Sequence, residues 1–264
     1  MKKLTRQFVF QQVYNMASIV EVSIEDEETL IELDWQDPKV INEITSFSKI
    51  SILHRYIYAM VAIRHRYDYR KNSDLYEEEE INKIEDLLTA YKVKYLTYKD
   101  FVLATFPNNI EEDLDIFYYW FLSQETSFES LWEKLTEEVF HLLFGNRAFL
   151  LRFNKAIARY LFDRKHLIPK EYLDENGTIK RHSLYSWVKK AVYFRDQGRC
   201  VLCQKDLSGL LSTDRINNFD HMVPLAQWGI NDPCNIQLLC QECNLKKGKR
   251  KSITGIRYTP WWQD

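Results

Sequence analysis

Two pairs of cysteines constrain this 264-residue chain more than any other feature of its sequence. Cys200 and Cys203 form one Cys-x-x-Cys pair, and Cys240 and Cys243 form a second pair after 36 intervening residues. Four thiolates fill every position around a tetrahedral zinc ion, so such a site is structural rather than catalytic. We expect one zinc ion to cross-link the two cysteine pairs and stabilise this segment. The alternative is a chance cluster of buried thiols. The fifth cysteine, Cys234, fits neither pair and is interpreted as a small buried hydrophobic residue.

The distribution of glycine predicts the fold class. All seven glycines lie at or beyond Gly145, and only Pro38 and Pro107 interrupt the preceding residues. A long stretch without chain breakers, rich in Leu, Ile, Glu and Lys, favours helices. We therefore expect a mainly α-helical chain, with a helical domain over residues 1–180 and a small zinc-stapled domain over residues 181–264.

Several local patterns predict where helices begin and end. Asp37-Pro38 is typical of a helix start, with Asp as the N-cap and Pro in the first turn. Gly145-Asn146 separates two amphipathic segments, and residues 183–196 form a helix pattern that leads into the first cysteine pair. A further helix is expected to begin at Asn108-Asn109, and residues 29–35 fit either a short strand or a helix end.

Charge is distributed unevenly along the chain, although the net charge is only -2. Residues 181–264 contain 13 Lys and Arg against 7 Asp and Glu, whereas the preceding residues contain 23 against 31. A basic C-terminal region suits a polyanionic partner, and the acidic remainder does not.

Hydrophobicity along the chain indicates its compartment. No apolar run approaches the roughly 20 residues of a membrane-spanning helix. Gln11 and Gln12 interrupt the place where a signal peptide needs an apolar core. We therefore expect a cytoplasmic protein, in which paired cysteines bind metal instead of forming disulfides.

A second set of residues occurs in a fixed order between and after the cysteine pairs. It consists of Asp220-His221, Pro224, Asn235 before an apolar run, and the segment Cys243-Asn244-Leu245-Lys246-Lys247-Gly248. Together with the cysteines, this order over roughly residues 195–251 resembles the HNH nuclease family. The resemblance implies two β-strands and a helix wrapped around one divalent cation.

The residue types match the chemistry of phosphodiester hydrolysis. A neutral imidazole can take a proton from water, which is the role that we expect for His221. Asp220 and Asn244 offer the oxygen ligands that Mg²⁺ or Mn²⁺ prefers, and the cation acts as a Lewis acid. By resemblance, Asn235 braces the loop that bears the histidine and does not touch substrate.

Two positions depart from the pattern of the family. Asn244 stands where the family name implies histidine, and asparagine there favours Mg²⁺ or Mn²⁺ over softer ions. Trp228 stands where relatives often have the first glycine of a pair, so the turn at that position is expected to differ. Neither departure removes a catalytic group.

A basic run follows the last expected metal ligand. It comprises Lys246, Lys247, Lys249 and Arg250, which are expected to hold nucleic-acid phosphates without reading sequence. The alternative is a solvated, charged helix end.

These observations predict a metal-dependent endonuclease that acts on DNA, with structural zinc and catalytic Mg²⁺ or Mn²⁺. The alternative is a non-catalytic zinc-containing module that binds nucleic acid or protein. Fusions of this type of nuclease domain to an otherwise featureless domain resemble the proteins of bacterial restriction, antiphage defence and toxin systems. In such a system, the acidic helical domain would dock an ATPase or sensor protein.

Overall fold

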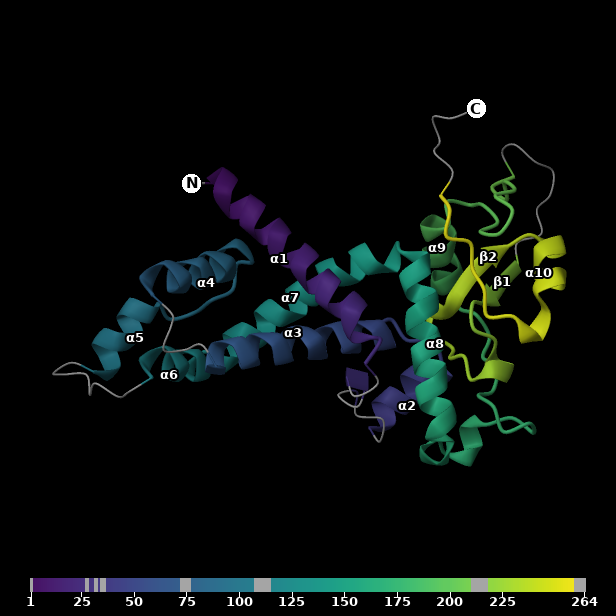
Figure 1. Ribbon diagram of the computed structural model, residues 1–264, viewed down its shortest axis with the longest axis horizontal. Helices are drawn as coiled ribbons and strands as arrows, with labels where there is room; N and C mark the ends of the chain where they lie inside the picture. The colour runs from purple at the N-terminus through teal and green to yellow at the C-terminus, as the bar shows by residue number, and fades with distance from the viewer. Residues whose placement is uncertain are drawn as a thin grey trace. The chain divides into compact units, whose positions relative to one another are not determined.

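The chain is mainly α-helical. The computed structural model describes residues 2–26, 29–30, 33, 37–71, 77–106, 115–209 and 218–258, with side chains from residue 11 onward. These residues form ten α-helices and one two-stranded sheet (Figure 1). The prediction of a helical chain with a small C-terminal element of two strands, a helix and a four-cysteine cluster is confirmed.

The chain divides into two compact units, each built from two segments. The first unit comprises Met1–Val20 and Ile57–Phe140, and the second comprises Glu21–Tyr56 and His141–Asp264. The boundary expected near residue 180 stays a prediction.

The first unit is a helical assembly with an aromatic core. Its helices lie wholly or mostly within the unit, and they are α1 (Lys2–Ser23), α3 (Ile52–Lys71), α4 (Glu78–Ala90), α5 (Tyr98–Thr105), α6 (Ile116–Ser123) and α7 (Glu125–Phe144). Trp120, Phe128 and Trp132 are fully buried, and the Trp132 indole donates a hydrogen bond to His65 Nδ1 at 2.7 Å. The aromatic residues of this region thus serve mainly as core, although Tyr119 is half exposed.

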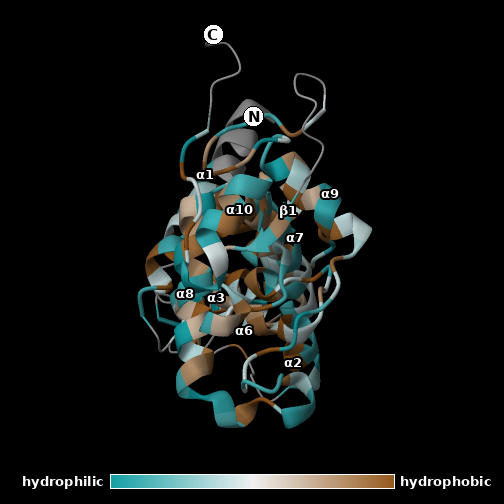
Figure 2. Ribbon diagram, turned by 90° about the vertical axis from the view of Figure 1, so that its right-hand side faces the viewer, coloured by the Kyte–Doolittle hydropathy of each residue, from teal (hydrophilic) through white to brown (hydrophobic). Residues whose placement is uncertain are grey.

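The second unit contains the remaining helices and the sheet. Its elements are α2 (Pro38–Thr45), α8 (Arg147–Asp163), α9 (Ser186–Arg195), β1 (Asn218–His221), β2 (Ile236–Leu239) and α10 (Gln241–Lys247). Strands β1 and β2 pair antiparallel, with Asp220 opposite Gln237 and His221 opposite Ile236. Helix α10 follows β2 directly and contacts β1, which completes the two-strand and helix element (Figure 1). In Figure 2, α10 is largely hydrophilic, in keeping with its sequence QECNLKK.

The helix starts expected at Asp37-Pro38 and after Gly145 are found, and the helix expected over residues 183–196 spans Ser186–Arg195. The Asp37 side chain accepts a hydrogen bond from Lys39 N at 2.8 Å, with Pro38 in the first turn of α2. Asn146 caps α8 by accepting from Phe149 N at 3.1 Å. The helix start expected at Asn108-Asn109, and most of residues 29–35, lie outside the described residues.

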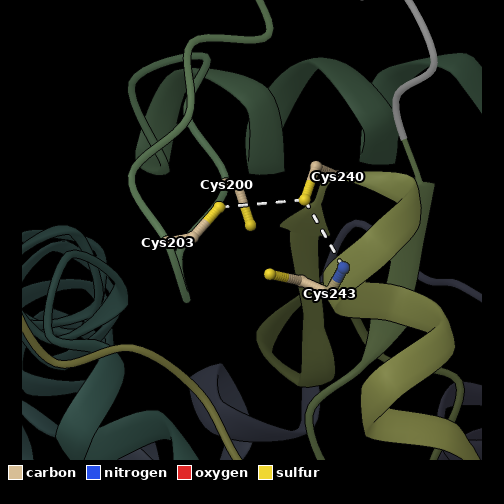
Figure 3. A group of neighbouring side chains, drawn as sticks. All are labelled: Cys200, Cys203, Cys240 and Cys243. Carbon is tan, nitrogen blue, oxygen red and sulfur yellow. Dashed lines mark hydrogen bonds between the residues drawn. The ribbon is translucent and has the colours of Figure 1, made fainter.

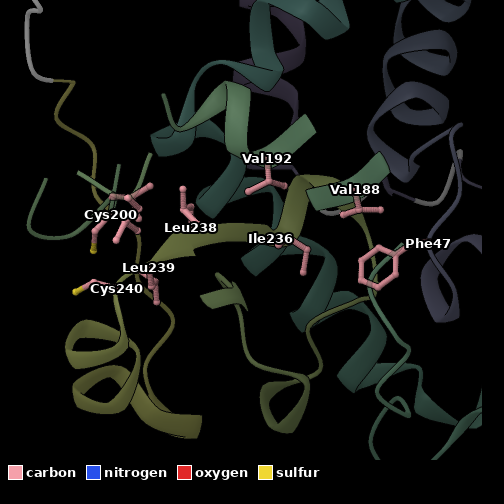
Figure 4. Close-up of a cluster of buried hydrophobic side chains, with 10 residues drawn as sticks. Phe47, Val188, Val192, Cys200, Ile236, Leu238, Leu239 and Cys240 are labelled. Carbon is pink, nitrogen blue, oxygen red and sulfur yellow. The ribbon is translucent and has the colours of Figure 1, made fainter. Parts of the chain in front are cut away.

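A cluster of buried apolar side chains holds β2 in place (Figure 4). All four residues of β2 are buried. Val188 and Val192 of α9 pack in this cluster with Ile236 and Leu238 of β2, and Phe47 joins it from the α2–α3 connection. Cys200 and Cys240 belong to the same cluster, so the cysteine pairs rest directly on the apolar core.

Buried charges connect this core to the C-terminal segment. Arg195 Nε and Nη2 each donate to the carboxylate of Asp196 at 2.9 Å, and Arg147 Nη1 lies 3.5 Å from Asp196 Oδ1. Asp196 Oδ2 also accepts from Leu238 N at 2.9 Å, while Arg147 Nε donates to Gly255 O at 2.7 Å. One carboxylate thus neutralises two buried guanidinium groups and joins α8, α9 and β2. Arg147 extends this network to the C-terminal segment.

None of the described helices is long and apolar enough to cross a lipid bilayer.

We expect Asp196→Ala to lower the free energy of unfolding by about 3–5 kcal/mol, because it leaves buried guanidinium groups without a counter-charge. Urea denaturation of the zinc-loaded protein measures this loss. Glu242→Ala removes the same charge from an exposed pair with Lys246 and should leave the midpoint unchanged. Equal midpoints for the two variants would contradict the assigned role of Asp196.

Candidate metal centre and active site

The four paired cysteines converge on one point (Figure 3). Their Sγ atoms all lie within 4.8 Å of one another, and Cys203 Sγ is 3.8 Å from Cys240 Sγ. Four thiol groups at this separation fit a single tetrahedral zinc ion. Cys234 is fully buried elsewhere, with its Sγ 3.7 Å from Ser51 Oγ, as expected for a cysteine outside the cluster.

The turn at the first cysteine pair explains why Gly198 precedes it. Gly198 has φ of 63°, and a Cβ at this position would lie 2.7 Å from the Tyr193 hydroxyl oxygen. Backbone hydrogen bonds from Gln204 N to Cys200 O and from Cys200 N to Lys205 O close the turn. At the second pair, Cys240 caps α10 by accepting from Cys243 N at 3.5 Å. Hydrogen bonds within the two turns therefore orient the sulfur atoms independently of a bound metal ion.

Asp220 and His221 end strand β1 and face a cavity of about 590 Å³. Asn244 of α10 lines the same cavity. The structure thus brings together the carboxylate, the imidazole and the amide that the sequence predicted to act together. Carboxylate and amide oxygens are hard ligands, so Asp220 and Asn244 fit Mg²⁺ or Mn²⁺.

The orientation of His221 is set by an asparagine. His221 is 2% exposed, and its Nε2 lies 3.2 Å from Asn231 Oδ1. Asn231 Nδ2 donates to Thr45 O and to Lys180 O, both at 2.8 Å, which fixes Oδ1 as the atom that faces the imidazole. Since Oδ1 can only accept, Nε2 carries the proton and Nδ1 keeps its lone pair. Nδ1 is buried and has no hydrogen-bond partner among the described residues.

The surroundings of His221 keep its ring neutral. The pKa of His221 is lowered to about 4, chiefly by burial and also by the positive charge of Arg181, while the charge of Asp220 acts in the opposite direction. A pKa below 7 means that the ring is unprotonated at neutral pH and can accept a proton. A phosphate anion beside the ring would raise the pKa towards neutrality and strengthen the base.

The loop that contains Asn231 is anchored to the last turn of α2 and to the first residue of α3. Asn231 N donates to Ile44 O at 3.0 Å, and the Asp232 carboxylate accepts from Ile52 N at 2.9 Å. Asp232 also accepts from Cys234 N at 2.7 Å. The end of α2 and the start of α3 therefore hold the loop that orients the His221 imidazole.

Asn235 joins the two ends of the loop after β1. Its Oδ1 accepts from Val223 N at 2.9 Å, and its Nδ2 donates to Val223 O and Ile230 O, both at 3.0 Å. Asn235 is fully buried and does not line the cavity. This geometry suits the bracing role expected from the sequence, and its contribution to activity stays a prediction.

The turn at Trp228 adopts an unusual conformation. Trp228 has φ of 62°, a left-handed conformation that glycine adopts more easily. Its indole meets Phe162 edge to face, with ring centroids 6.4 Å apart, and its side chain is buried. At Gly229, a Cβ would lie 1.9 Å from Val223 O, so only glycine fits. The turn therefore combines left-handed backbone geometry with a buried aromatic ring at the first of the two positions.

The four basic residues after Asn244 occupy different places. Lys246 is exposed and pairs with Glu242 at 2.6 Å. Lys249 lines the cavity, and Arg250 is exposed. Lys247 is buried, with its ammonium 2.7 Å from Asp220 Oδ2 and 2.8 Å from His221 O. Lys247 is therefore engaged inside the protein rather than on the phosphate-binding surface predicted for it.

Two residues of the site were not identified from the sequence. Asn231 stands in an Asn-Asp-Pro turn, a pattern that indicates a turn and says nothing about a contact with histidine. Arg181 lines the cavity from the segment before α9, with Asp174 and Thr178, and no spacing connects it to Asp220. Both positions depend on tertiary packing.

We expect Cys203→Ala to lose bound zinc, because three thiolates leave the tetrahedral ion incomplete. Metal analysis of the purified protein checks this, with one zinc per chain expected for the parent. Cys234→Ala is the matched control and should retain zinc. Retention of zinc by Cys203→Ala, or its loss from Cys234→Ala, would contradict the assigned ligand set.

Comparison with known proteins places this site in a family. The family model described as HNH endonuclease matches residues 200–250, which include all four clustered cysteines, Asp220, His221 and Asn244. Comparison with curated proteins and with solved structures gave no significant match. The C-terminal region of this chain therefore contains an HNH endonuclease domain.

Proposed function

We propose that the chain is a metal-dependent endonuclease that hydrolyses phosphodiester bonds in DNA. The observation that carries this proposal is the single cavity lined by Asp220, His221 and Asn244. A neutral imidazole with an unpaired Nδ1 supplies a base, and two oxygen donors beside it supply a cation site. A module that only binds nucleic acid has no need for this combination.

The proposed reaction begins with proton transfer. A water molecule in the cavity gives a proton to His221 Nδ1, while the Nε2–H stays directed at Asn231 Oδ1. The resulting hydroxide attacks phosphorus, and the bond from phosphorus to the leaving oxygen breaks. A divalent cation held by Asp220 and Asn244 would supply the positive charge that polarises the phosphate and stabilises the leaving oxygen. Arg181 and Lys249 line the cavity and can neutralise phosphate charge.

Asn231 acts through His221 in this mechanism. It selects the ring tautomer with a free Nδ1 and accepts the hydrogen bond that stabilises the imidazolium formed during proton transfer. Because Asn231 does not touch substrate, it is a positioning residue.

The distribution of charge supports the proposed DNA substrate and the proposed biological system. Lys246, Lys249 and Arg250 are exposed beside the cavity and suit contacts with the DNA backbone. The acidic helical residues would then be available to a partner such as an ATPase or sensor, in a cytoplasmic restriction or antiphage defence system. This context rests on the charge difference and the family resemblance.

We expect His221→Ala to lower plasmid nicking by about 10²–10⁴-fold, because the general base is removed. The assay follows conversion of supercoiled plasmid with Mg²⁺ and Mn²⁺ titrated. Zinc content and the unfolding midpoint serve as controls and should match those of the parent.

Two outcomes would count against this proposal. Equal nicking by His221→Ala and the parent would remove His221 from the mechanism. A parent protein that binds duplex DNA but leaves plasmid intact in Mg²⁺, Mn²⁺ and Ni²⁺ would favour the alternative of a non-catalytic binding module.

We expect Asn231→Ala to lower kcat about 10–100-fold with little change in KM, because loss of a hydrogen-bond partner misorients the base. The double variant His221→Ala/Asn231→Ala should be no slower than His221→Ala alone, since Asn231 acts only through the ring. A further loss of activity in the double variant would show a role for Asn231 that is independent of His221.

A further inference from the structure

A second cavity, of about 360 Å³, lies between α8 and the loop that follows β1. Helix α8 contributes Lys155, Arg159 and Phe162, and the loop contributes Gln227 and Trp228. Ser252 lines it from the segment after α10. The α8 residues precede the part of the chain that the HNH family model matches, so the family match assigns them no role.

This cavity borders the candidate active site. Ala226 lines both cavities, and it belongs to the short 3-10 turn Leu225–Gln227. The basic segment that follows α10 connects them as well, since Lys249 lines the first cavity and Ser252 lines the second. Gln227 secures this connection, because its Nε2 donates to Arg250 O at 2.9 Å and its Oε1 accepts from Ser252 Oγ.

The lining of the second cavity matches the chemistry of a nucleic-acid strand. Two cationic side chains, Lys155 and Arg159, line it, and none of its lining residues is a carboxylate. These two residues are four apart on α8 and therefore lie on one face, where like charges disfavour the helix. Phe162 is 53% exposed and presents an aromatic ring beside them. Cations next to an exposed ring suit phosphates together with a sugar or base.

Lys249, Arg250 and Lys251 extend this charge towards the catalytic cavity. They are exposed and lie on the segment that runs from one cavity to the other. A strand whose phosphate sits beside His221 would therefore meet the segment of Lys249, Arg250 and Lys251 as it leaves the site over the 3-10 turn.

We propose that the second cavity binds backbone phosphates of the nucleic-acid strand being cut, outside the cleaved bond. Lys155 and Arg159 are its phosphate contacts, and Phe162 packs against the sugar or base. The inference rests on the proposed nuclease function and extends its substrate track to helix α8.

The test is the salt dependence of DNA binding. A fluorescent duplex is titrated with the zinc-loaded protein in the absence of Mg²⁺, so that binding is measured without cleavage, at several salt concentrations. Each phosphate contact contributes about 0.9 to the slope of log affinity against log salt. We expect Lys155→Ala/Arg159→Ala to reduce the slope by about 1–2 and to weaken binding.

Two matched variants distinguish phosphate binding at the second cavity from a general effect of positive charge on the protein surface. Lys189→Ala/Lys190→Ala removes the same charge from exposed positions on α9 that line neither cavity, and it should keep the slope of the parent. Lys155→Arg/Arg159→Lys keeps the cations and should also keep the slope.

The outcomes distinguish this inference from the proposed function. An unchanged slope in Lys155→Ala/Arg159→Ala, or an equal loss in the α9 variant, would overturn the second site while plasmid cleavage by the parent still supports the nuclease. If the parent neither binds duplex DNA nor cuts plasmid, the proposed function fails and this inference fails with it.

Discussion

The arrangement of the candidate active site depends on the hydrogen bonds of one buried amide. Asn231 Nδ2 is held by two backbone carbonyl groups, from Thr45 and Lys180, and its Oδ1 therefore has a fixed direction towards His221. Were the amide free to rotate, either ring nitrogen of the histidine could carry the proton. The tautomer that leaves Nδ1 available follows from backbone atoms of α2 and of the segment before α9.

The local structure of the HNH motif in this chain consequently depends on contacts with residues outside the motif. The loop that follows β1 is closed from within by Asn235, but its outer contacts are made by Ile44, Thr45 and Ile52, far earlier in the sequence. The apolar cluster shows the same dependence, because Phe47 packs with α9 and β2. Residues outside the family match thus complete both the core and the geometry of the candidate site.

The sequence predicted those features that are encoded locally. The spacing of Cys200, Cys203, Cys240 and Cys243 led to the thiol cluster, and capping residues such as Asp37 marked helix starts, because both depend on neighbours along the chain. Asn231 and the burial of Lys247 could not be predicted in the same way. A turn asparagine and a helical lysine acquire their partners only when distant segments pack, and neither leaves a periodic signal.

The pairing of Lys247 with Asp220 gives the two candidate metal sites different electrostatic surroundings. The Lys247 ammonium already lies 2.7 Å from the carboxylate, so the protein itself provides a counter-charge for this buried edge of the cavity. Under the proposed function, the charge at Asp220 is thus balanced before a hydrolytic cation binds, and such a cation would be free to exchange between rounds of cleavage. A metal ion held by the four clustered thiols would instead be part of the fold.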